Sequence, residues 1–116
     1  MKFYGYDNCS TCKKAEKFLK DNNIKYKKLD IILNPPDEIT LKQIIDNSDY
    51  KIKDLFNKSG QVYREMNMKD KIDQMKEEEL IKLLSENGKL IKRPILINDN
   101  KFAVGFKEDI FSNVFK

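Results

Sequence analysis

The chain has 116 residues, of which 40% are hydrophobic and 36% are charged, and its formal net charge is +4. This length suits one domain, and because the lysines alternate with acidic residues, as on solvated helix faces, we expect no direct binding of nucleic acid. No apolar run approaches the roughly 18 residues that span a membrane, and Asp7 and Asn8 interrupt the stretch that a signal peptide would need, so we expect a cytoplasmic protein without membrane contact.

The first thirty residues predict a strand, a helix and a second strand. Aromatic residues over 2–6 favour a short strand, and apolar residues at helix spacing over 13–19 favour a helix. Alternating apolar and polar residues over 24–31 predict the second strand. A strand–helix–strand unit of this length predicts that its two strands are parallel.

The middle of the chain, about residues 35–88, predicts a helical insertion without strands. It opens with Pro35-Pro36, which cannot continue a strand ladder, and it closes at Asn87-Gly88, a good stop signal for a helix. Between these points we expect helices over residues 39–45, 52–56 and 77–86. We also expect a turn or a short helix over residues 62–66.

The last part of the chain predicts a hairpin and a closing helix. Residues 93–97 read as a strand that opens with proline, 98–100 as a turn and 101–105 as the partner strand. Residues 107–115 then carry apolar residues at helix spacing. The complete order predicts an α/β fold in which helices pack against a four-stranded mixed sheet.

Cys9 and Cys12, the only cysteines of the chain, lie where the first strand gives way to the first helix. Free backbone N–H groups and the helix dipole stabilise a thiolate at such a position. Cys9 lies at or just before the first turn and is the better nucleophile. Cys12, one turn later, is placed to attack a mixed disulfide formed on Cys9 and release the partner.

Three other interpretations of the cysteine pair stay open. A zinc site needs four ligands, and because this chain has no histidine it would require two chains. Both cysteines could be inert core residues, since a free cysteine often packs as a small hydrophobic side chain. A permanent disulfide would close only a very small loop and stabilise the fold little. The redox interpretation rests on the C-x-x-C spacing in a chain that we expect in a reducing compartment.

Four motifs follow one another along the whole chain. They are Tyr4 with Cys9-Ser10-Thr11-Cys12-Lys13-Lys14-Ala15, Phe56-Asn57-Lys58-Ser59-Gly60 with Tyr63-Arg64-Glu65, Lys92-Arg93-Pro94-Ile95, and Val104-Gly105-Phe106-Lys107-Glu108-Asp109. In this order they resemble the ArsC/Spx family, so the resemblance implies a single thioredoxin-like domain over residues 1–116. It further implies that Cys9 is the reactive cysteine, that Arg93 faces it, and that Pro94 is in the cis form beside it.

The resemblance to glutaredoxin-linked arsenate reductases implies a thiol-dependent oxidoreductase. Those enzymes place three arginines around the oxyanion, and Arg93 matches one of them. Asn57 and Phe106 stand at the other two positions, with Lys58 and Lys107 beside them. Because lysine does not reproduce the bidentate fork of arginine, we expect arsenate to be a poor substrate.

The candidate site residues follow from the cysteine pair and this resemblance. The candidate catalytic residues are Cys9, Cys12 and Arg93, and the candidate substrate-binding residues are Ser10, Thr11, Pro94, Lys58 and Lys107. The hydroxyl groups of Ser10 and Thr11 are also candidates for capping the first helix. We expect no bound cofactor and no metal, and we expect glutathione with glutaredoxin, or thioredoxin, to return the pair to the dithiol.

The resemblance to Spx/MgsR-type proteins, redox-sensing regulators that bind RNA polymerase, implies an alternative function. In that case the Cys9–Cys12 disulfide would control docking on the α subunit of RNA polymerase. Redox-dependent capture of that subunit favours the regulator, whereas turnover of a disulfide without any partner favours the enzyme.

Overall fold

The strands form one four-stranded sheet in the order β2-β1-β3-β4. A computed structural model describes all of residues 1–116. The strands are β1 Lys2–Gly5, β2 Lys27–Asp30, β3 Ile95–Asn98 and β4 Lys101–Val104. β1 pairs in parallel with β2 and antiparallel with β3, and β3 and β4 form an antiparallel hairpin. The predicted mixed sheet with its parallel first pair is therefore confirmed.

Six α-helices and two 3₁₀ turns complete the fold. They are α1 Ser10–Asp21, α2 Glu38–Asp46, η1 Ile52–Leu55, α3 Gln61–Glu65, α4 Met68–Lys71, α5 Glu77–Glu86, η2 Gly88–Leu90 and α6 Glu108–Phe115. The expected helix at 52–56 is a single 3₁₀ turn, and Phe56 instead forms an isolated antiparallel bridge with Ile91. The sequence did not predict α4, which begins after Asn67 in the left-handed conformation (φ 53°). None of these helices combines the length and the apolar character needed to cross a membrane.

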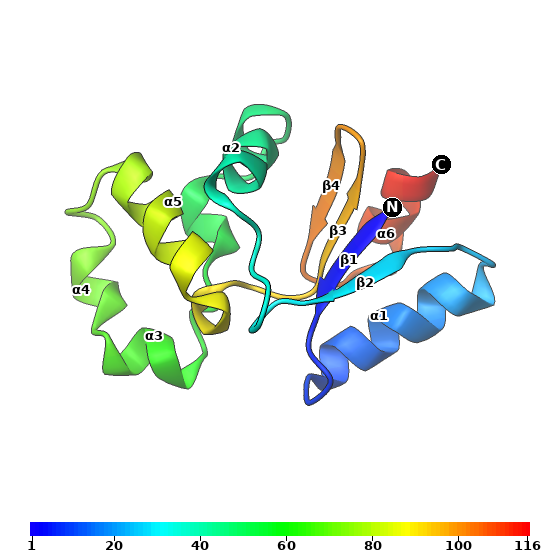
Figure 1. Cartoon of the computed structure of the whole chain (residues 1–116), viewed down its shortest axis with the longest axis horizontal. Helices are drawn as coiled ribbons and strands as arrows, with labels where there is room; N and C mark the ends of the chain where they lie inside the picture. Colours follow the sequence, from blue (N-terminus) through cyan, green and yellow to red (C-terminus); the bar gives the residue numbers. More distant parts are fainter.

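The alternation of side chains along the strands gives the sheet two buried faces. One face carries Phe3, Leu96 and Ala103, and α1 and α6 cover it. The opposite face carries Tyr4, Ile95 and Val104 and packs against the helical insertion. Figure 1 shows the insertion, from α2 to α5, on one side of the sheet and α1 on the other. Burial on both faces explains why the first three residues of β3, Ile95, Leu96 and Ile97, are all apolar.

The second strand is shorter than predicted. The sequence pattern extends over 24–31, whereas β2 begins at Lys27, because Lys27 pairs with Lys2, the first residue of β1. Tyr26, before that point, instead packs its ring on Phe3 at 5.5 Å between centroids and donates a hydrogen bond to Glu16 at 2.8 Å. The first residue of β1 therefore sets the first residue of β2.

The helical insertion is fastened to the segment that enters β3 by two backbone hydrogen bonds. The N–H of Asn57 donates to the carbonyl of Leu90 at 2.7 Å, and the N–H of Lys92 donates to the carbonyl of Leu55 at 2.7 Å. These bonds hold the end of η1 beside residues 90–92. The backbone segments 55–57 and 90–92 are therefore held together where the insertion meets the sheet.

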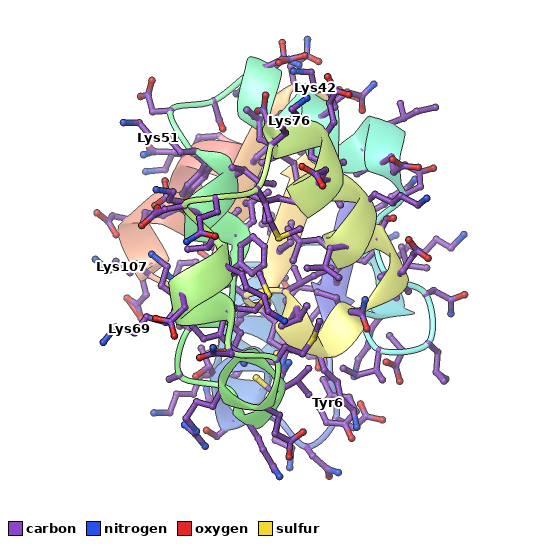
Figure 2. The ribbon with its side chains drawn as sticks, turned by 90° about the vertical axis from the view of Figure 1, so that its left-hand side faces the viewer. Tyr6, Lys42, Lys51, Lys69, Lys76 and Lys107 are labelled. Carbon is purple, nitrogen blue, oxygen red and sulfur yellow. The ribbon has the colours of Figure 1, made fainter.

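Figure 2 labels five lysines that come from different parts of the chain. They are Lys42, Lys51, Lys69, Lys76 and Lys107. Lys42 pairs with Asp46 at 3.3 Å, and two lysines outside this set, Lys17 and Lys28, pair with Asp21 at 2.8 Å and Asp7 at 2.7 Å. This distribution agrees with the expectation of hydrated, mixed-charge helix faces.

Candidate functional site

Cys9 is the residue that caps the N-terminus of α1. Its backbone is extended (φ −102°, ψ 111°), and its Sγ accepts a hydrogen bond from the N–H of Cys12 at 3.2 Å. The expectation that Ser10 or Thr11 caps the helix is therefore wrong, because the capping acceptor is the sulfur and Ser10 is already the first helical residue. A sulfur at this point faces the positive end of the helix dipole, which stabilises negative charge on it.

Cys12 lies directly behind Cys9 in the core between the sheet and α1. Its side chain is 1% exposed and packs in the cluster that contains Phe3 and Phe111. Burial, followed by the interaction with Cys9, raises the pKa of the Cys12 thiol to about 12. Both cysteines are free thiols, and Cys9 is half-buried whereas Cys12 is buried.

Iodoacetamide is expected to alkylate Cys9 and leave Cys12 unmodified in the folded protein at pH 8. Alkylation requires an accessible thiolate, whereas Cys12 is buried and its pKa is raised to about 12, so at that pH its thiol is protonated and enclosed. Peptide mapping by mass spectrometry after timed quenching measures the two rates. The control is the protein in urea, where both cysteines react. Equal rates in the folded protein would contradict the assignment of Cys12 as the enclosed thiol.

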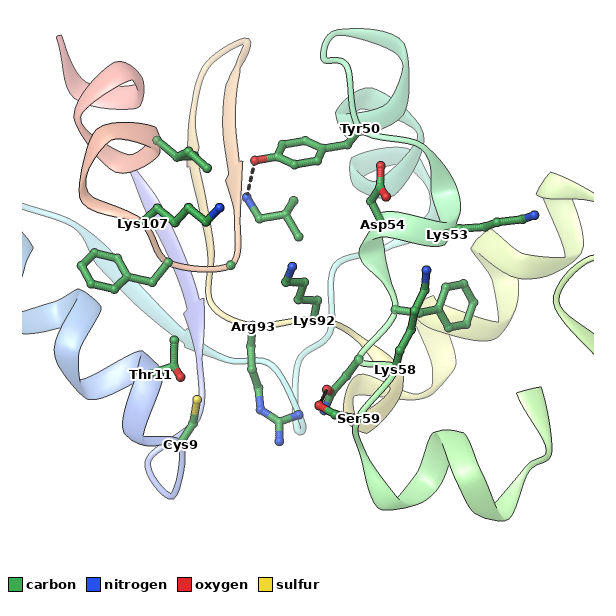
Figure 3. Close-up of a pocket in the computed structure, with 16 residues that line it drawn as sticks. Cys9, Thr11, Tyr50, Lys53, Asp54, Lys58, Ser59, Lys92, Arg93 and Lys107 are labelled. Atoms are coloured by element: carbon green, nitrogen blue, oxygen red, sulfur yellow. Dashed lines mark hydrogen bonds between the residues drawn. The ribbon is translucent and has the colours of Figure 1, made fainter. Parts of the chain in front are cut away.

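Cys9 opens onto a cavity of about 860 Å³ between the sheet and the helical insertion. Figure 3 shows Cys9 and Thr11 on one wall, contributed by α1, and Lys58 and Ser59 on the opposite wall, contributed by the insertion. Residues from four parts of the chain line it: Cys9, Thr11, Tyr50, Lys53, Asp54, Phe56, Asn57, Lys58, Ser59, Lys92, Arg93, Val104, Gly105, Phe106, Lys107 and Ile110.

Arg93 projects toward the end of the cavity where Cys9 lies (Figure 3). The peptide bond from Arg93 to Pro94 is cis, as the resemblance implied. The guanidinium carbon lies over the ring of Tyr6 at 5.5 Å from its centroid, a cation–π arrangement that fixes the side chain. One terminal nitrogen, Nη1, is buried without a hydrogen-bond partner. A buried charged donor without a partner is costly, so this nitrogen is suited to an anionic ligand.

The structure brings most of the candidate residues together. Cys9, Thr11, Arg93, Lys58 and Lys107 line the cavity, with Cys12 behind Cys9. The other two candidates do not line it. Ser10 is exposed on the first turn of α1, and Pro94 is buried and accepts a hydrogen bond through its carbonyl from the N–H of Gly105 at 2.8 Å.

Three further residues are placed by the structure in the cavity wall. Asn57 and Phe106, which the resemblance to the arsenate reductases placed at two arginine positions, both line it. Lys92 also lines it and was missed as a site residue, although its place next to Arg93 was a signal.

Tyr50 lines the cavity as well, and nothing in the sequence pointed to it. Its hydroxyl oxygen accepts a hydrogen bond from the N–H of Val104 at 3.1 Å (Figure 3). The side chain therefore connects the helical insertion to β4 across the top of the cavity.

The sequence was compared with models of known protein families. The model of the ArsC family matches residues 4–114. The chain belongs to the ArsC family. The uncharacterized protein YusI of Bacillus subtilis is 41% identical over 111 residues, which are 96% of this chain and 94% of YusI.

Solved structures of ArsC family relatives have the same fold. A protein of Bacteroides fragilis described as related to the ArsC family is 42% identical, with a TM-score of 0.93 over 97% of this chain and 95% of its own. A protein of Streptococcus mutans described as a possible arsenate reductase is 39% identical, with a TM-score of 0.86 over 91% and 90%. The thioredoxin-like fold and its helical insertion are thus confirmed.

More distant relatives of this chain are described as transcriptional regulators. The global transcriptional regulator Spx of Enterococcus faecalis is 28% identical over 94% of this chain and 81% of Spx. This chain is therefore similar both to a protein described as a possible arsenate reductase and to a protein described as a regulator.

Proposed function

We propose that this ArsC family protein is a thiol–disulfide oxidoreductase in which Cys9 attacks and Cys12 resolves. The observation that carries the proposal is the arrangement of the two sulfurs. Cys9 lines the cavity, and its Sγ accepts a hydrogen bond from the N–H of Cys12 at 3.2 Å. The Cys12 side chain is buried behind Cys9. A substrate disulfide can reach the first sulfur, and only the second sulfur is positioned to reach the first from within the protein.

The reaction balances as two exchanges. The Cys9 thiolate attacks one sulfur of a substrate disulfide, the S–S bond breaks, and the leaving thiolate takes up a proton. Cys12 then loses its proton and attacks Cys9, which releases the second substrate thiol and forms the Cys9–Cys12 disulfide. The substrate gains two electrons and the protein loses two, and an external dithiol or two glutathione molecules return them.

The raised pKa of Cys12 supports this division of roles. In the dithiol, burial and the neighbouring Cys9 sulfur both oppose ionisation of Cys12. Once Cys9 is bound in a mixed disulfide its sulfur can no longer carry a charge, so one cause of the raised pKa of Cys12 is removed. Ionisation of Cys12 then becomes easier at the step that needs its thiolate.

Arg93 is the candidate for holding the substrate and for stabilising thiolate charge beside Cys9. Its unpaired Nη1 is available to an anionic group, and its stacking on Tyr6 limits its freedom before a substrate binds. Arg93 is thus proposed as a binding and electrostatic residue, with no proton transfer assigned to it.

The proposal is tested by equilibrating the reduced protein with glutathione buffers of increasing oxidation state and measuring the intact mass. The expected product has lost two hydrogen atoms, in a single two-electron transition, and peptide mapping places the bond between Cys9 and Cys12. A protein that stops at a stable glutathione adduct on Cys9, with Cys12 still reduced, overturns the proposed role of Cys12.

Arsenate is expected to be reduced weakly or not at all with glutathione and glutaredoxin. Arg93 provides one guanidinium group that can bind the oxyanion through two hydrogen bonds, whereas Asn57 and Phe106 provide none. Each missing charged hydrogen bond costs about 1.5–3 kcal/mol, so affinity should fall by roughly two to four orders of magnitude. NADPH consumption in the coupled assay measures turnover.

The matched variants for arsenate are Asn57→Arg alone and together with Phe106→Arg. The single variant is needed because the Phe106 ring packs on Phe18 at 5.7 Å and on Phe111 at 5.0 Å between centroids, contacts that arginine would lose. Robust wild-type turnover at micromolar arsenate would show that the expectation is wrong. Absence of any gain in both variants would show that these two positions do not serve the oxyanion.

A second candidate function is a redox-switched regulator that docks on the α subunit of RNA polymerase. The similarity over most of the chain to Spx favours it, together with the Cys9–Cys12 pair. Capture of the purified α subunit by the oxidised and the reduced protein tests it. Binding in one redox state alone supports the regulator, and no binding in either state excludes it.

A further inference from the structure

We infer that the cavity beside Cys9 binds a thiol or disulfide that carries phosphate groups; the disulfide chemistry rests on the proposed function. The first observation is the charge of the cavity wall. Lys58, Lys92, Arg93 and Lys107 line the cavity, and none of them lies within 4.0 Å of an acidic oxygen. Lys53 differs from them, since it forms an ion pair with Asp73.

The wall offers almost nothing to a positively charged ligand group. Asp54 is the single acidic residue that lines the cavity. Its carboxylate already accepts a hydrogen bond from the backbone N–H of Lys51 at 2.9 Å, as part of the turn that starts η1. A wholly anionic ligand therefore fits the charges better than a zwitterionic one such as glutathione, whose ammonium group would face four unpaired cations.

Lys92 is the central cation of this set, and the backbone holds it there. Its own N–H is bonded to the carbonyl of Leu55 at 2.7 Å. Its side chain crosses Gly105, where a Cβ atom would lie 2.8 Å from the Cε of Lys92 and where φ is +78°. Figure 3 shows the Lys92 amine between Lys58 on one wall and Lys107 on the other. Glycine at 105 thus leaves the space through which the amine enters the cavity.

Size and lining favour a ligand larger than a single tetrahedral anion. A cavity of about 860 Å³ is within the range of sites for whole cofactors and metabolites, and a lone oxyanion would fill little of it. Phe56, Val104 and Ile110 add apolar surface for the chain of a thiol. Lysines bind phosphate as point charges, and a phosphate monoester carries about −1.5 to −2 at neutral pH. A phosphate-bearing arm can thus reach several lysines while its sulfur reaches Cys9.

The reaction is the one already balanced above. One disulfide of the phosphate-bearing thiol gives two free thiols, and the reduced Cys9 and Cys12 become the protein disulfide. The phosphate groups take no part in the chemistry and serve only to hold the substrate.

The test compares coenzyme A disulfide with pantethine, which has the same disulfide arm without the phosphates, and with glutathione disulfide. The reduced protein is mixed with each at low ionic strength, and its oxidation is followed by intact mass. We expect coenzyme A disulfide to react about tenfold faster than pantethine, because several lysine–phosphate pairs add small gains. We expect this ratio to shrink as salt is added.

The matched variants are Lys92→Gln and Gly105→Ala, with Lys69→Gln as the control. The first removes the central charge, and the second keeps the charge but displaces the side chain that crosses Gly105. Because Lys58, Arg93 and Lys107 remain in the wall, both variants are expected to lower the coenzyme A disulfide to pantethine ratio by about twofold. Lys69 is exposed on α4 and does not line the cavity, so its variant is expected to keep the wild-type ratio.

A binding measurement separates failure of this inference from failure of the proposed function. Calorimetry with coenzyme A and pantetheine, which as thiols cannot oxidise the reduced protein, reports the cavity alone. If no disulfide oxidises the protein but coenzyme A binds more tightly than pantetheine, the oxidoreductase proposal fails and the phosphate site stands. Equal rates for both disulfides with equal binding overturn the inference, as does glutathione disulfide reacting as fast as coenzyme A disulfide.

Discussion

Cys9→Ser is expected to slow the reduction of a small disulfide by about a thousandfold or more, because the serine hydroxyl is not ionised at neutral pH and does not attack sulfur. The substitution leaves an oxygen that can accept the N–H of Cys12 at the start of α1, so the helix cap and the fold are kept. The measurement is the release of thiol from the disulfide at neutral pH.

Cys12→Ser is the matched variant for this result. In this variant Cys9 is expected to attack the disulfide as in the wild type. The reaction then stops at the mixed disulfide on Cys9, because no resolving thiol is present, and intact mass detects this adduct. A Cys9→Ser protein that keeps a tenth of the wild-type rate would reverse the roles and make Cys12 the attacking residue. That outcome would also require Cys12 to leave its buried position, where it is 1% exposed.

Gly88→Ala is expected to lower the free energy of unfolding by about 3 kcal/mol or more. A Cβ atom at this position would lie 1.9 Å from the carbonyl oxygen of Ile31 and 2.9 Å from the Cα of Ile32. Both are backbone atoms, so no side-chain rotation relieves the overlap. Urea unfolding followed by circular dichroism measures the change.

Gly60→Ala is the control for Gly88→Ala, because it makes the same chemical change where the nearest atom can move. Its Cβ would lie 2.7 Å from the amide nitrogen of the Asn57 side chain, and the backbone there (φ −78°) accepts alanine. We expect its cost to be below about 1 kcal/mol. Equal stability of Gly88→Ala and wild type would mean that the chain after β2 is free to shift away from η2.

The sheet and the long helices were predictable from the sequence because their patterns are local. Alternation and helix spacing each report one element, and Asn87-Gly88 marks the end of α5. Strand ends were less predictable, since Lys27 begins β2 only because Lys2 begins β1. The short α4 also escaped prediction, because a four-residue helix has too few positions to show a period.

The cysteine pair of the site was predictable because its two members stand on one helix turn. Arg93 was expected in the site through the resemblance to a family, and it lines the cavity together with Cys9. Lys92 and Tyr50 were not expected in the site, since the direction of each side chain depends on a contact with a residue distant in sequence. The direction of Lys92 follows from the missing side chain of Gly105, and that of Tyr50 from its hydrogen bond to Val104.

The hydrogen bond between Tyr50 and Val104 also bears on how the protein behaves at high concentration. β4 is an outer strand of the sheet, and the unpaired backbone groups of an outer strand can template pairing with another chain. Because the hydroxyl of Tyr50 already occupies the N–H of Val104, an approaching strand would have to displace this tyrosine before it could pair there. The side chain that connects the insertion to β4 therefore also blocks the pairing of another strand at this position of the edge.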